Sequence, residues 1–537
     1  MTRVRMKGTR LIAALMMTAV LALVLAMLVG CASTSSSDGS GEAKRGGDKV
    51  LTLCFPSTVT SLDVSSNDAT MLKEVAGVLE TLVNTDSDFN LLPSLATSWE
   101  RTGDNTWVFH LREGVKFHDG TDMDAAAVKW CFDRAAANNK SFAKYTSYAS
   151  SEVQDDHTLE ITTSIPTGEL PAALTNVSTS IIAPTSVNAA GEFVQPVGTG
   201  YFQYKDFDVS TGEFKCVTFD GYWGGAQDSS IVERDVKCIS DSSTRSLAAQ
   251  NGEVDIATDV PFTDLQTLKD AKNVEVTSYE TARTYFYSYN LHKAYLADAN
   301  VRKALIYALN KEDIVNNALQ GVGSVPNGIF MDAVQWNNAS VDTYEYNVDL
   351  AKQMLDEAGF KDTDGDGYRD WNGESVTIDI VTGSRRPGNA LIAQATQGYF
   401  DQIGVKAKVN VLDGTAYSQK IDNGDFDMAL DSAATGYIPS AAYYLYQNYY
   451  SGSSNAQKIG YSNPELDELV AQCRNMEAGE AKNEVSRQAQ AIAQNDAAIY
   501  TVAHYGAVFV LNPKIEGFSY SAAVHDFIVP YTTDLAD

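Results

Sequence analysis

The chain has 537 residues, more than one hydrophobic core normally organises, so we expect two or three lobes. Hydrophobic residues make up 44% of the chain and charged residues 20%, which excludes disorder for most of it. The chain has 40 lysines and arginines and 69 aspartates and glutamates, which gives a net charge of −29. Such an acidic protein repels phosphates, which argues against binding nucleic acid or anionic lipid surfaces.

Residues 1–30 have the layout of an export signal. Residues 1–10 carry four cations and no acid, and residues 11–30 are almost wholly apolar. The apolar run is long enough to cross a bilayer, so a retained transmembrane anchor is the alternative. The sequence Leu-Val-Gly-Cys at 28–31 resembles the bacterial lipobox, which implies cleavage before Cys31 and lipid on its sulfur. Both interpretations place the body outside the cytoplasm.

A Ser/Gly-rich segment, residues 31–48, follows the signal and predicts a flexible tether. With Cys31 lipidated, the remaining cysteines are odd in number, which leaves at least one thiol unpaired. They are Cys54, Cys131, Cys216, Cys238 and Cys473. Cys216 and Cys238 lie in alternating, strand-like runs and are candidates for a pair. The alternative is that they are buried free thiols.

The body alternates strand and helix patterns. In chain order the pattern predicts a strand at 50–55, a helix at 69–82, strands at 105–111, 114–117, 158–163 and 199–209, a helix at 242–251, a strand at 253–257, and helices at 301–319 and 350–358. Strands and helices then alternate over 376–429. This order predicts an α/β fold with a partly parallel sheet covered by helices.

Motifs of common enzymes are missing from the sequence. No GxSxG elbow, HExxH motif, phosphate-binding P-loop or GxGxxG is present, and the six histidines show no metal-binding spacing. We therefore predict no catalytic residues and no cofactor. An extracytoplasmic enzyme is kept as the alternative from another class, although nothing nominates its nucleophile.

Four aspartates follow the spacing of the first half of a calcium loop, in which alternate oxygens converge on a hard cation. They are Asp362, Asp364, Asp366 and Asp370. The bidentate acid expected at loop position 12 is replaced by Gly373. The alternative interpretation is a tight Asp/Gly turn that enters a hairpin.

Several blocks closely resemble the family 5 extracellular solute-binding proteins, the oligopeptide, dipeptide and nickel receptors of ABC importers. The blocks are LATSWERTGDNTWVFHLREGVKFHDG at 95–120, its continuation over 124–134, PVGTG at 196–200, DGYWGG around Trp223, STR at 243–245, GEVDI at 252–256, NVRKALIYALNKEDIVNNALQG at 300–321, and YSNPELDEL at 461–469. The likeness spans nearly the whole body. We expect the conspicuous aromatic residues Trp99, Trp107, Phe109 and Phe117 to pack in a hairpin rather than contact ligand.

The resemblance implies a two-lobe α/β fold of the type II periplasmic-binding-protein kind, with a hinge between the lobes and an enlarged first lobe. Lobe I would comprise 49–283 plus 504–537, with an extra subdomain at about 85–200, and lobe II would comprise 284–503. Solute would bind between the lobes and stabilise their closure. The implied partners are ABC permease subunits and their ATPases, and we expect a monomer.

In peptide-binding members of the family, a lobe II aspartate shortly after a tryptophan anchors the peptide's amino group. Here Ser432 or Ala433 stands at the tryptophan position and Thr435 at the aspartate position. The resemblance therefore puts a free-amine anchor in doubt. Nickel-binding members use a histidine, and none lies between His292 and His504, so nickel is expected only as a preformed anionic chelate or with different ligands.

The leading site candidates follow a strand and begin a helix, a place that points into the ligand crevice of open α/β sheets. They are Ser384, Arg385 and Arg386. The two guanidiniums and the helix amino terminus suit a carboxylate. The alternative is a solvated turn that pairs with acidic neighbours.

A tyrosine-rich stretch offers a second candidate, either as an aromatic cleft wall or as ordinary helix packing. It contains Tyr443, Tyr444, Tyr446, Tyr449 and Tyr450, and Tyr437 precedes it. The sequence therefore predicts a lipid-anchored receptor on the outer face of the cytoplasmic membrane or in the periplasm, which captures peptides or peptide-like solutes for an ABC importer. The alternatives are a nickel or metal-chelate receptor of the same family, a lipoprotein enzyme, and a receptor that signals without transport.

Overall fold

The computed structural model describes residues 49–57, 59–65, 69–523 and 528–537. The predicted signal at 1–30, the lipidation site Cys31 and the tether lie outside the described residues. Among the helices of the described part, none combines the length and the apolar character needed to cross a membrane.

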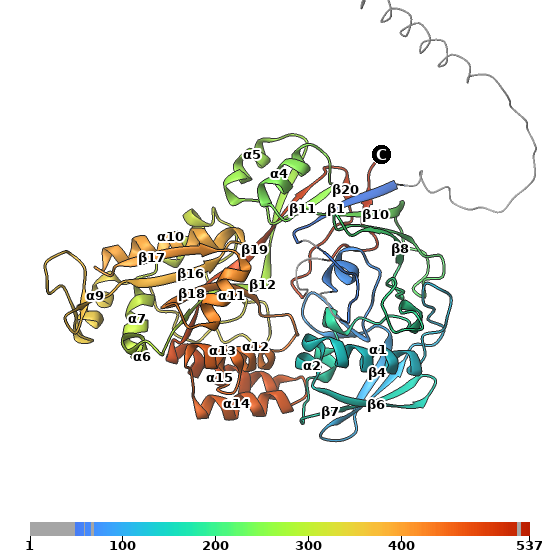
Figure 1. Ribbon diagram of the computed structural model, residues 1–537, viewed down its shortest axis with the longest axis horizontal. Helices are drawn as coiled ribbons and strands as arrows, with labels where there is room; N and C mark the ends of the chain where they lie inside the picture. Colours follow the sequence, from blue (N-terminus) through green and yellow to red (C-terminus); the bar gives the residue numbers. More distant parts are fainter. Residues whose placement is uncertain (1–48, 58, 66–68, 524–527) are drawn as a thin grey trace, which may run out of the picture. The chain divides into compact units, whose positions relative to one another are not determined.

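A ten-stranded sheet forms the centre of the body. Its strands in spatial order are β17 (Ala407–Leu412), β16 (Ile378–Gly383), β18 (Met428–Ala434), β12 (Glu275–Tyr289), β19 (Ile499–Leu511), β11 (Ile256–Thr258), β1 (Lys49–Phe55), β10 (Ile231–Cys238), β9 (Glu213–Thr218) and β8 (Phe202–Asp208). β12 and β19 are long antiparallel neighbours in the middle of this order (Figure 1). β16 runs parallel to β17 and β18 on one side, and β1 runs parallel to β10 and β11 on the other. The mixed, partly parallel sheet is as predicted.

Helices connect the strands and cover the sheet. They are α1 (Ala125–Asn138), α2 (Lys140–Thr146), α3 (Leu170–Ala173), α4 (Ser242–Gln250), α5 (Leu265–Asp270), α6 (Ala294–Ala297), α7 (Ala299–Tyr307), α8 (Lys311–Asp313), α9 (Val348–Glu357), α10 (Pro387–Gln402), α11 (Gly414–Asp422), α12 (Ala441–Tyr449), α13 (Ser454–Ile459), α14 (Pro464–Asn475) and α15 (Glu480–Asp496). Short 3-10 and π turns are η1 (Met71–Val75), η2 (Val177–Thr179), η3 (Pro184–Ser186), η4 (Phe262–Asp264) and η5 (Ile314–Ala318).

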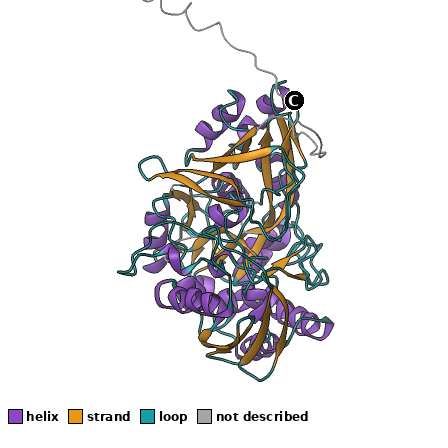
Figure 2. Ribbon diagram, turned by 90° about the vertical axis from the view of Figure 1, so that its right-hand side faces the viewer, coloured by secondary structure: helices purple, strands orange, loops and turns teal. Residues whose placement is uncertain are grey.

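A separate four-stranded sheet lies in the predicted subdomain. Its order is β4 (Ala96–Arg101), β5 (Thr106–Leu111), β7 (Thr158–Thr163) and β6 (Tyr148–Asp155), drawn in orange near the bottom of Figure 2. Trp107, Phe109 and Phe117 are buried, and Trp99 packs against Phe109 with ring centroids 6.4 Å apart. The prediction that these aromatic residues serve packing is therefore confirmed for Phe109 and Phe117, which lie in the apolar core.

Small sheets complete the body. They are β2 (Val83–Thr85) with β3 (Leu91–Pro93), β13 (Phe360–Lys361) with β14 (Asp370–Trp371) and β15 (Glu374–Ser375), and β20 (Ile515–Glu516) with β21 (Asp534–Leu535). The apolar core falls into one large cluster along the ten-stranded sheet and a second cluster beneath α12, α14 and α15.

Three predicted elements are wrong in extent. The helix expected at 69–82 is reduced to η1, because Gly77 adopts a left-handed φ of +73° and turns the chain. The helix expected at 301–319 breaks after α7, where the side chain of Asn310 accepts a hydrogen bond from the Asp313 amide and starts a new turn. Residues 114–117 form no strand, only an isolated bridge at Lys116.

The pairing of β12 with β19 is interrupted between Glu280 and Thr284, and it resumes where Thr284 faces His504. The chain is predicted to pass between lobes near Arg283 and His504. The interruption falls at that place, and the lobe boundaries stay a prediction.

The five described cysteines are free thiols, and four of them are buried. Cys216 stands opposite Arg234 and Cys238 opposite Phe55, so the two are not cross-strand partners. Burial raises the pKa of the Cys131 thiol to about 11, which makes it a poor nucleophile. The alternative of free thiols is therefore confirmed for these residues.

Candidate ligand-binding site

The predicted arginine pair separates in the structure. Arg386 is the N-cap residue of α10, directly after the turn that leaves β16, and only 7% of it is exposed. Its neighbours Ser384 and Arg385 are exposed, and the Ser384 amide donates to the Leu412 carbonyl. The turn thus directs one guanidinium inward and the other to solvent.

Arg386 forms a buried ion pair with Asp259, which follows a strand in the other half of the ten-stranded sheet. Its Nη1 donates to Oδ2 of Asp259 at 2.7 Å, and both side chains are more than nine-tenths buried. Asp259 follows β11 and has a φ of +54°. The hydroxyl of Tyr505 on β19 donates to the other carboxylate oxygen. A charge-assisted bond therefore joins segments 127 residues apart in the sequence.

A second guanidinium lies near the first. The Arg283 and Arg386 guanidinium carbons lie 6.0 and 5.7 Å from the centroid of the Tyr505 ring, and Tyr285 packs against that ring at 5.1 Å. We call Asp259, Arg283, Arg386 and Tyr505 the hinge site. Two like charges held around one ring favour negative partners, and Asp259 is one of them.

β18 contributes the other carboxyl group near the hinge site. Burial raises the pKa of Asp431, while Arg283 and Arg386 oppose that shift. The Asp431 carboxylate accepts from the Ser432 amide at 2.7 Å and from the Tyr417 hydroxyl at 3.3 Å. Burial therefore favours the protonated acid, whereas Asp259 has a direct guanidinium partner.

The candidates that follow from the peptide-binding pattern lie along β18 and the loop after it. Ser432 and Ala433 are strand residues that pair with β12, and Ala433 faces Thr284. Thr435 is buried, and both its amide and its hydroxyl donate to the carbonyl of Ala282. The residue at the aspartate position thus holds backbone and carries no charge.

Tyr437 and Tyr443 are brought together by a tyrosine that the sequence analysis missed. Tyr145 of α2 meets Tyr437 at 5.3 Å and Tyr443 at 5.2 Å between ring centroids, both edge-to-face. Burial, followed by the neighbouring Tyr145, raises the pKa of Tyr443. The aromatic cluster joins the predicted subdomain to the predicted lobe II. Helix packing accounts for Tyr444 and Tyr449, which are buried in the second core cluster.

A further contact between the two predicted lobes lies beyond the aromatic cluster. The Glu169 carboxylate accepts from Lys482 Nζ at 2.9 Å and from the Ser440 hydroxyl. The amide of Gly168 donates to the Arg474 carbonyl at 3.0 Å. A Cβ built on Gly168 would lie 2.1 Å from the Met476 carbonyl oxygen, so only glycine fits this approach.

The aspartate-rich loop forms the turn that the sequence predicts. It connects β13 to β14 in a small antiparallel sheet, which is the predicted hairpin turn. Carboxyl oxygens of Asp362, Asp364 and Asp370 lie within 4.8 Å of one another, and Asp366 is not part of that group. Asp362 accepts from the Gly365 amide at 2.7 Å. These bonds account for the turn, and calcium binding stays a prediction.

The sequence analysis overlooked several residues that make these contacts. Asp259, Tyr145 and Glu169 belong to none of the highlighted motifs, and Arg283 was noted only as a boundary. Asp259 alone carried a readable signal, because it directly follows a buried strand of the sheet.

Comparison with known proteins places this arrangement in a family. The model of the "Bacterial extracellular solute-binding proteins, family 5 Middle" matches residues 90–456, more than half of the chain. The chain belongs to this family. It is therefore an extracytoplasmic substrate-binding protein of an ABC importer, which works with permease and ATPase subunits. The family's relatives are binding proteins rather than enzymes.

Individual relatives differ in what their names say they bind. The glutathione-binding protein GsiB of Escherichia coli (strain K12) is 28% identical over 460 residues, which is 83% of this chain and 86% of that protein. The crystal structure of a nickel ABC transporter protein from Bacillus halodurans is 27% identical with a TM-score of 0.75, and covers 91% of this chain and 100% of that one. The oligopeptide-binding protein AppA of Bacillus subtilis, solved with a nonapeptide, is 22% identical with a TM-score of 0.73 and the same coverage. The two-lobe fold is thus confirmed.

Proposed function

We propose that this binding protein captures a peptide or peptide-like organic anion and holds a carboxylate of that solute at the hinge site. The observation that carries the proposal is the buried Arg386–Asp259 ion pair with Arg283 close by. In a chain with a net charge of −29, two guanidiniums around one ring are a local concentration of positive charge. The names of GsiB and AppA, which specify glutathione and oligopeptides, support this solute class.

We infer that such binding favours closure of the lobes. Arg386 belongs to α10 in the predicted lobe II, and Asp259 follows β11 in the predicted lobe I. A solute whose carboxylate accepts from Arg386, and whose other groups contact the predicted lobe I, stabilises the arrangement in which the two lobes meet. A solute shifts the equilibrium toward closure by as much as it prefers that arrangement.

The uncharged Thr435 adds a specificity. Threonine has no negative charge to offer a peptide ammonium, and its hydroxyl already donates to the Ala282 carbonyl. We therefore expect Ala-Ala-Ala and its N-acetyl form to bind with similar affinity. The C-terminal amide of the same peptide should bind more weakly by about tenfold or more, the usual value of a hydrogen bond to a charged group.

Calorimetric titration of these peptides and of glutathione tests the proposal, with native mass spectrometry of the purified protein to find a carried-over solute. Arg386→Lys keeps the charge but removes the bidentate fork, and it should weaken the carboxylate peptides without weakening the amide. Arg385→Ala is the matched control, since Arg385 is the exposed neighbour. Equal binding of acid and amide, or an unchanged Arg386→Lys variant, contradicts the proposal.

A metal chelate is the second candidate, favoured by the likeness to the nickel protein of Bacillus halodurans. The chain has no histidine between His292 and His504, and His504 is 1% exposed. We therefore expect any nickel to arrive as a preformed anionic complex, with Arg386 as its partner. Titration with nickel bis-histidine, against nickel chloride alone, distinguishes this candidate from the peptides.

We further propose that Cys31 carries a lipid that anchors the monomeric protein on the outer face of the cytoplasmic membrane. The lipobox-like residues 28–31 and the Ser/Gly-rich segment after them support this. Labelled palmitate should enter the wild type and not Cys31→Ala. Loss of solute uptake on deletion of the gene would separate transport from the enzyme and signalling alternatives.

A further inference from the structure

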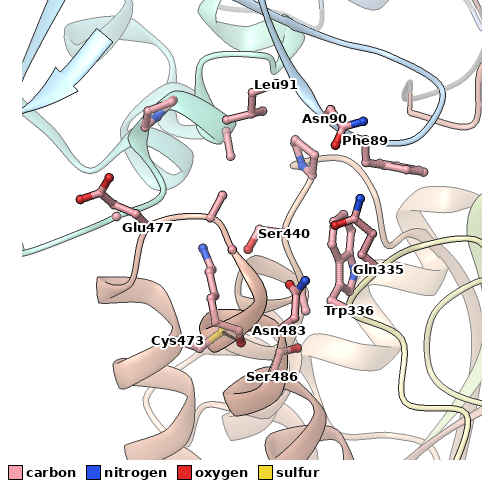
Figure 3. A pocket seen from close by; sticks show the side chains of 18 of the residues that line it. Phe89, Asn90, Leu91, Gln335, Trp336, Ser440, Cys473, Glu477, Asn483 and Ser486 are labelled. Carbon is pink, nitrogen blue, oxygen red and sulfur yellow. Dashed lines mark hydrogen bonds between the residues drawn. The ribbon is translucent and has the colours of Figure 1, made fainter.

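A cavity lies apart from the hinge site. It measures about 440 Å³ and is lined by residues 88–91, Trp99, Glu100, Trp107, Gly168, Pro171 and Ala172 of the predicted subdomain, and by segments of the predicted lobe II that include Trp336 and Lys482. We call it the Trp336 pocket (Figure 3). None of the four hinge-site residues lines it.

Aromatic rings form much of its wall. Phe89, Trp99, Trp107 and Trp336 all line the pocket. Phe89 and Trp336 meet edge-to-face with centroids 5.6 Å apart, and Figure 3 shows both on the side opposite Glu477. Ring faces carry negative potential and attract cations, so these walls favour an ammonium or guanidinium group with an apolar body.

One wall residue has an unused hydrogen-bond donor. Trp336 is 93% buried, and its Nε1–H has no acceptor in the described part of the chain. The other buried indole of the pocket, Trp107, donates its Nε1–H to the Thr167 carbonyl at 3.1 Å. An unpaired buried donor is rare in native proteins and calls for an explanation. The N–H group itself has almost no solvent-accessible surface, so the pocket is lined by the ring of Trp336 rather than by its N–H.

Charges at the pocket have the opposite sign from those at the hinge site. Asp88, Glu100 and Glu477 line it and are exposed. The one lining cation, Lys482, is neutralised by Glu169 at 2.9 Å. The mouth therefore presents net negative charge, which raises the local concentration of cations and repels anions.

From these observations we propose that the Trp336 pocket binds an organic cation: an ammonium or guanidinium group on an aromatic or apolar body. The cationic group lies between the aromatic faces and the acidic mouth. Because residues of both predicted lobes line the pocket, the occupant contacts both. The cation can be a free amine or a basic side chain of the transported solute.

Three probes with one hydroxyphenyl body test the charge preference: tyramine, which is cationic, tyrosol, which is neutral, and 4-hydroxyphenylacetate, which is anionic. Calorimetric titration of the purified protein should show tyramine at least about fivefold tighter than tyrosol, the scale of a cation–π contact, and no binding of the anion. Tyramine that binds no tighter than tyrosol overturns the proposal.

Variants then locate the binding. Trp336→Phe replaces the indole with a smaller ring that attracts cations less strongly, so tyramine binding should weaken several-fold. Asp88→Asn combined with Glu477→Gln changes only exposed acids, so the fold should survive while tyramine loses its advantage over tyrosol. The controls are Trp371→Phe and Glu357→Gln, neither of which lines the pocket. Tyramine affinity unchanged in both pocket variants overturns the proposal.

Two acetylated peptides distinguish the sources of the cation. If N-acetyl-Ala-Ala-Lys binds tighter than N-acetyl-Ala-Ala-Ala and Trp336→Phe abolishes the difference, the cation is a side chain of the solute. If the two peptides bind equally and tyramine displaces neither, the pocket takes a separate amine.

Discussion

Two of the contacts between the predicted lobes each contain a buried ion pair, but their surroundings have opposite charge. At the hinge site, Asp259 pairs with Arg386 while a second guanidinium, Arg283, stands near. At the Trp336 pocket, Lys482 pairs with Glu169, and the remaining lining charges are acids. Buried pairs alone are weak evidence for stability or function. The charge beside each pair decides which ligand it favours, an anion at the first and a cation at the second.

Arg386→Ala should give the largest effect on stability. It leaves the Asp259 carboxylate buried without its guanidinium partner, although it still accepts from the Tyr505 hydroxyl, and breaking a buried pair from one side costs about 3–5 kcal/mol. Urea unfolding at pH 7 measures the loss. Arg385→Ala removes the same side chain one residue earlier, at an exposed position, and should stay within about 0.5 kcal/mol of wild type. Equal losses of unfolding free energy in the two variants would mean that burial of the Arg386–Asp259 pair does not stabilise the protein.

Acid should destabilise the folded protein, because a buried histidine, His504, directly precedes Tyr505 of the hinge site. Burial lowers the pKa of His504 to about 4, and neither ring nitrogen has a partner in the described part of the chain. The folded state prefers neutral His504, so its contribution is complete above the unfolded pKa of about 6.5 and is lost as pH falls from there towards 4. The loss amounts to about 3 kcal/mol.

Unfolding free energies at several pH values between 7 and 4 test this, with His504→Leu as the variant. Leucine cannot gain a proton, so the variant should lose less stability on acidification than the wild type does. His110→Gln, at a half-exposed histidine of β5, is the matched control. Burial likewise lowers the pKa of His118 to about 4, so part of the acid sensitivity should persist in His504→Leu.

The pocket side of the comparison depends on a close backbone approach. Gly168→Ala would place a methyl group 2.1 Å from the Met476 carbonyl oxygen. That oxygen belongs to the backbone, so it cannot move aside as the end of a side chain could. We expect about 1–3 kcal/mol of destabilisation and weaker tyramine binding. Gly398→Ala in the middle of α10 meets no atom within 4 Å and should stabilise the protein by about 0.5–1 kcal/mol. Unfolding midpoints in urea report both, and an unaffected Gly168→Ala would mean that this contact is loose.

The sequence predicted local elements better than contacts between residues that are far apart in the chain. Local signals predicted β1, α4 and α9 closely, because each depends on periodicity and a nearby terminator such as Gly252. The helix at 301–319 failed, since Asn310 offers a cap that competes with helix continuation. The family blocks predicted the fold because their order along the chain is specific.

The site was predicted only in part. Arg386 was found because it stands between a strand and a helix. Its separation from Arg385, and its pairing with Asp259, depend on how a turn and a distant loop meet in space, which no single sequence displays. The Trp336 pocket was not foreseen at all. Its lining comes from segments hundreds of residues apart, so its aromatic wall and acidic mouth form only once the chain is folded.

The smallest effect should come from the exposed contact at the pocket edge. Arg101 donates from Nη1 to the Asn475 carbonyl at 2.9 Å and from Nη2 to the Asn475 side chain at 2.8 Å. Water can replace these bonds, so Arg101→Ala should cost about 0.5–1 kcal/mol and leave tyramine binding unchanged. Glu169→Gln, which takes a buried partner from Lys482, should cost several times more. Urea unfolding of both variants, side by side, measures how much of the lobe contact depends on burial. If Arg101→Ala proved as costly as Glu169→Gln, polar contacts over the whole edge, rather than the buried pair, would hold the pocket together.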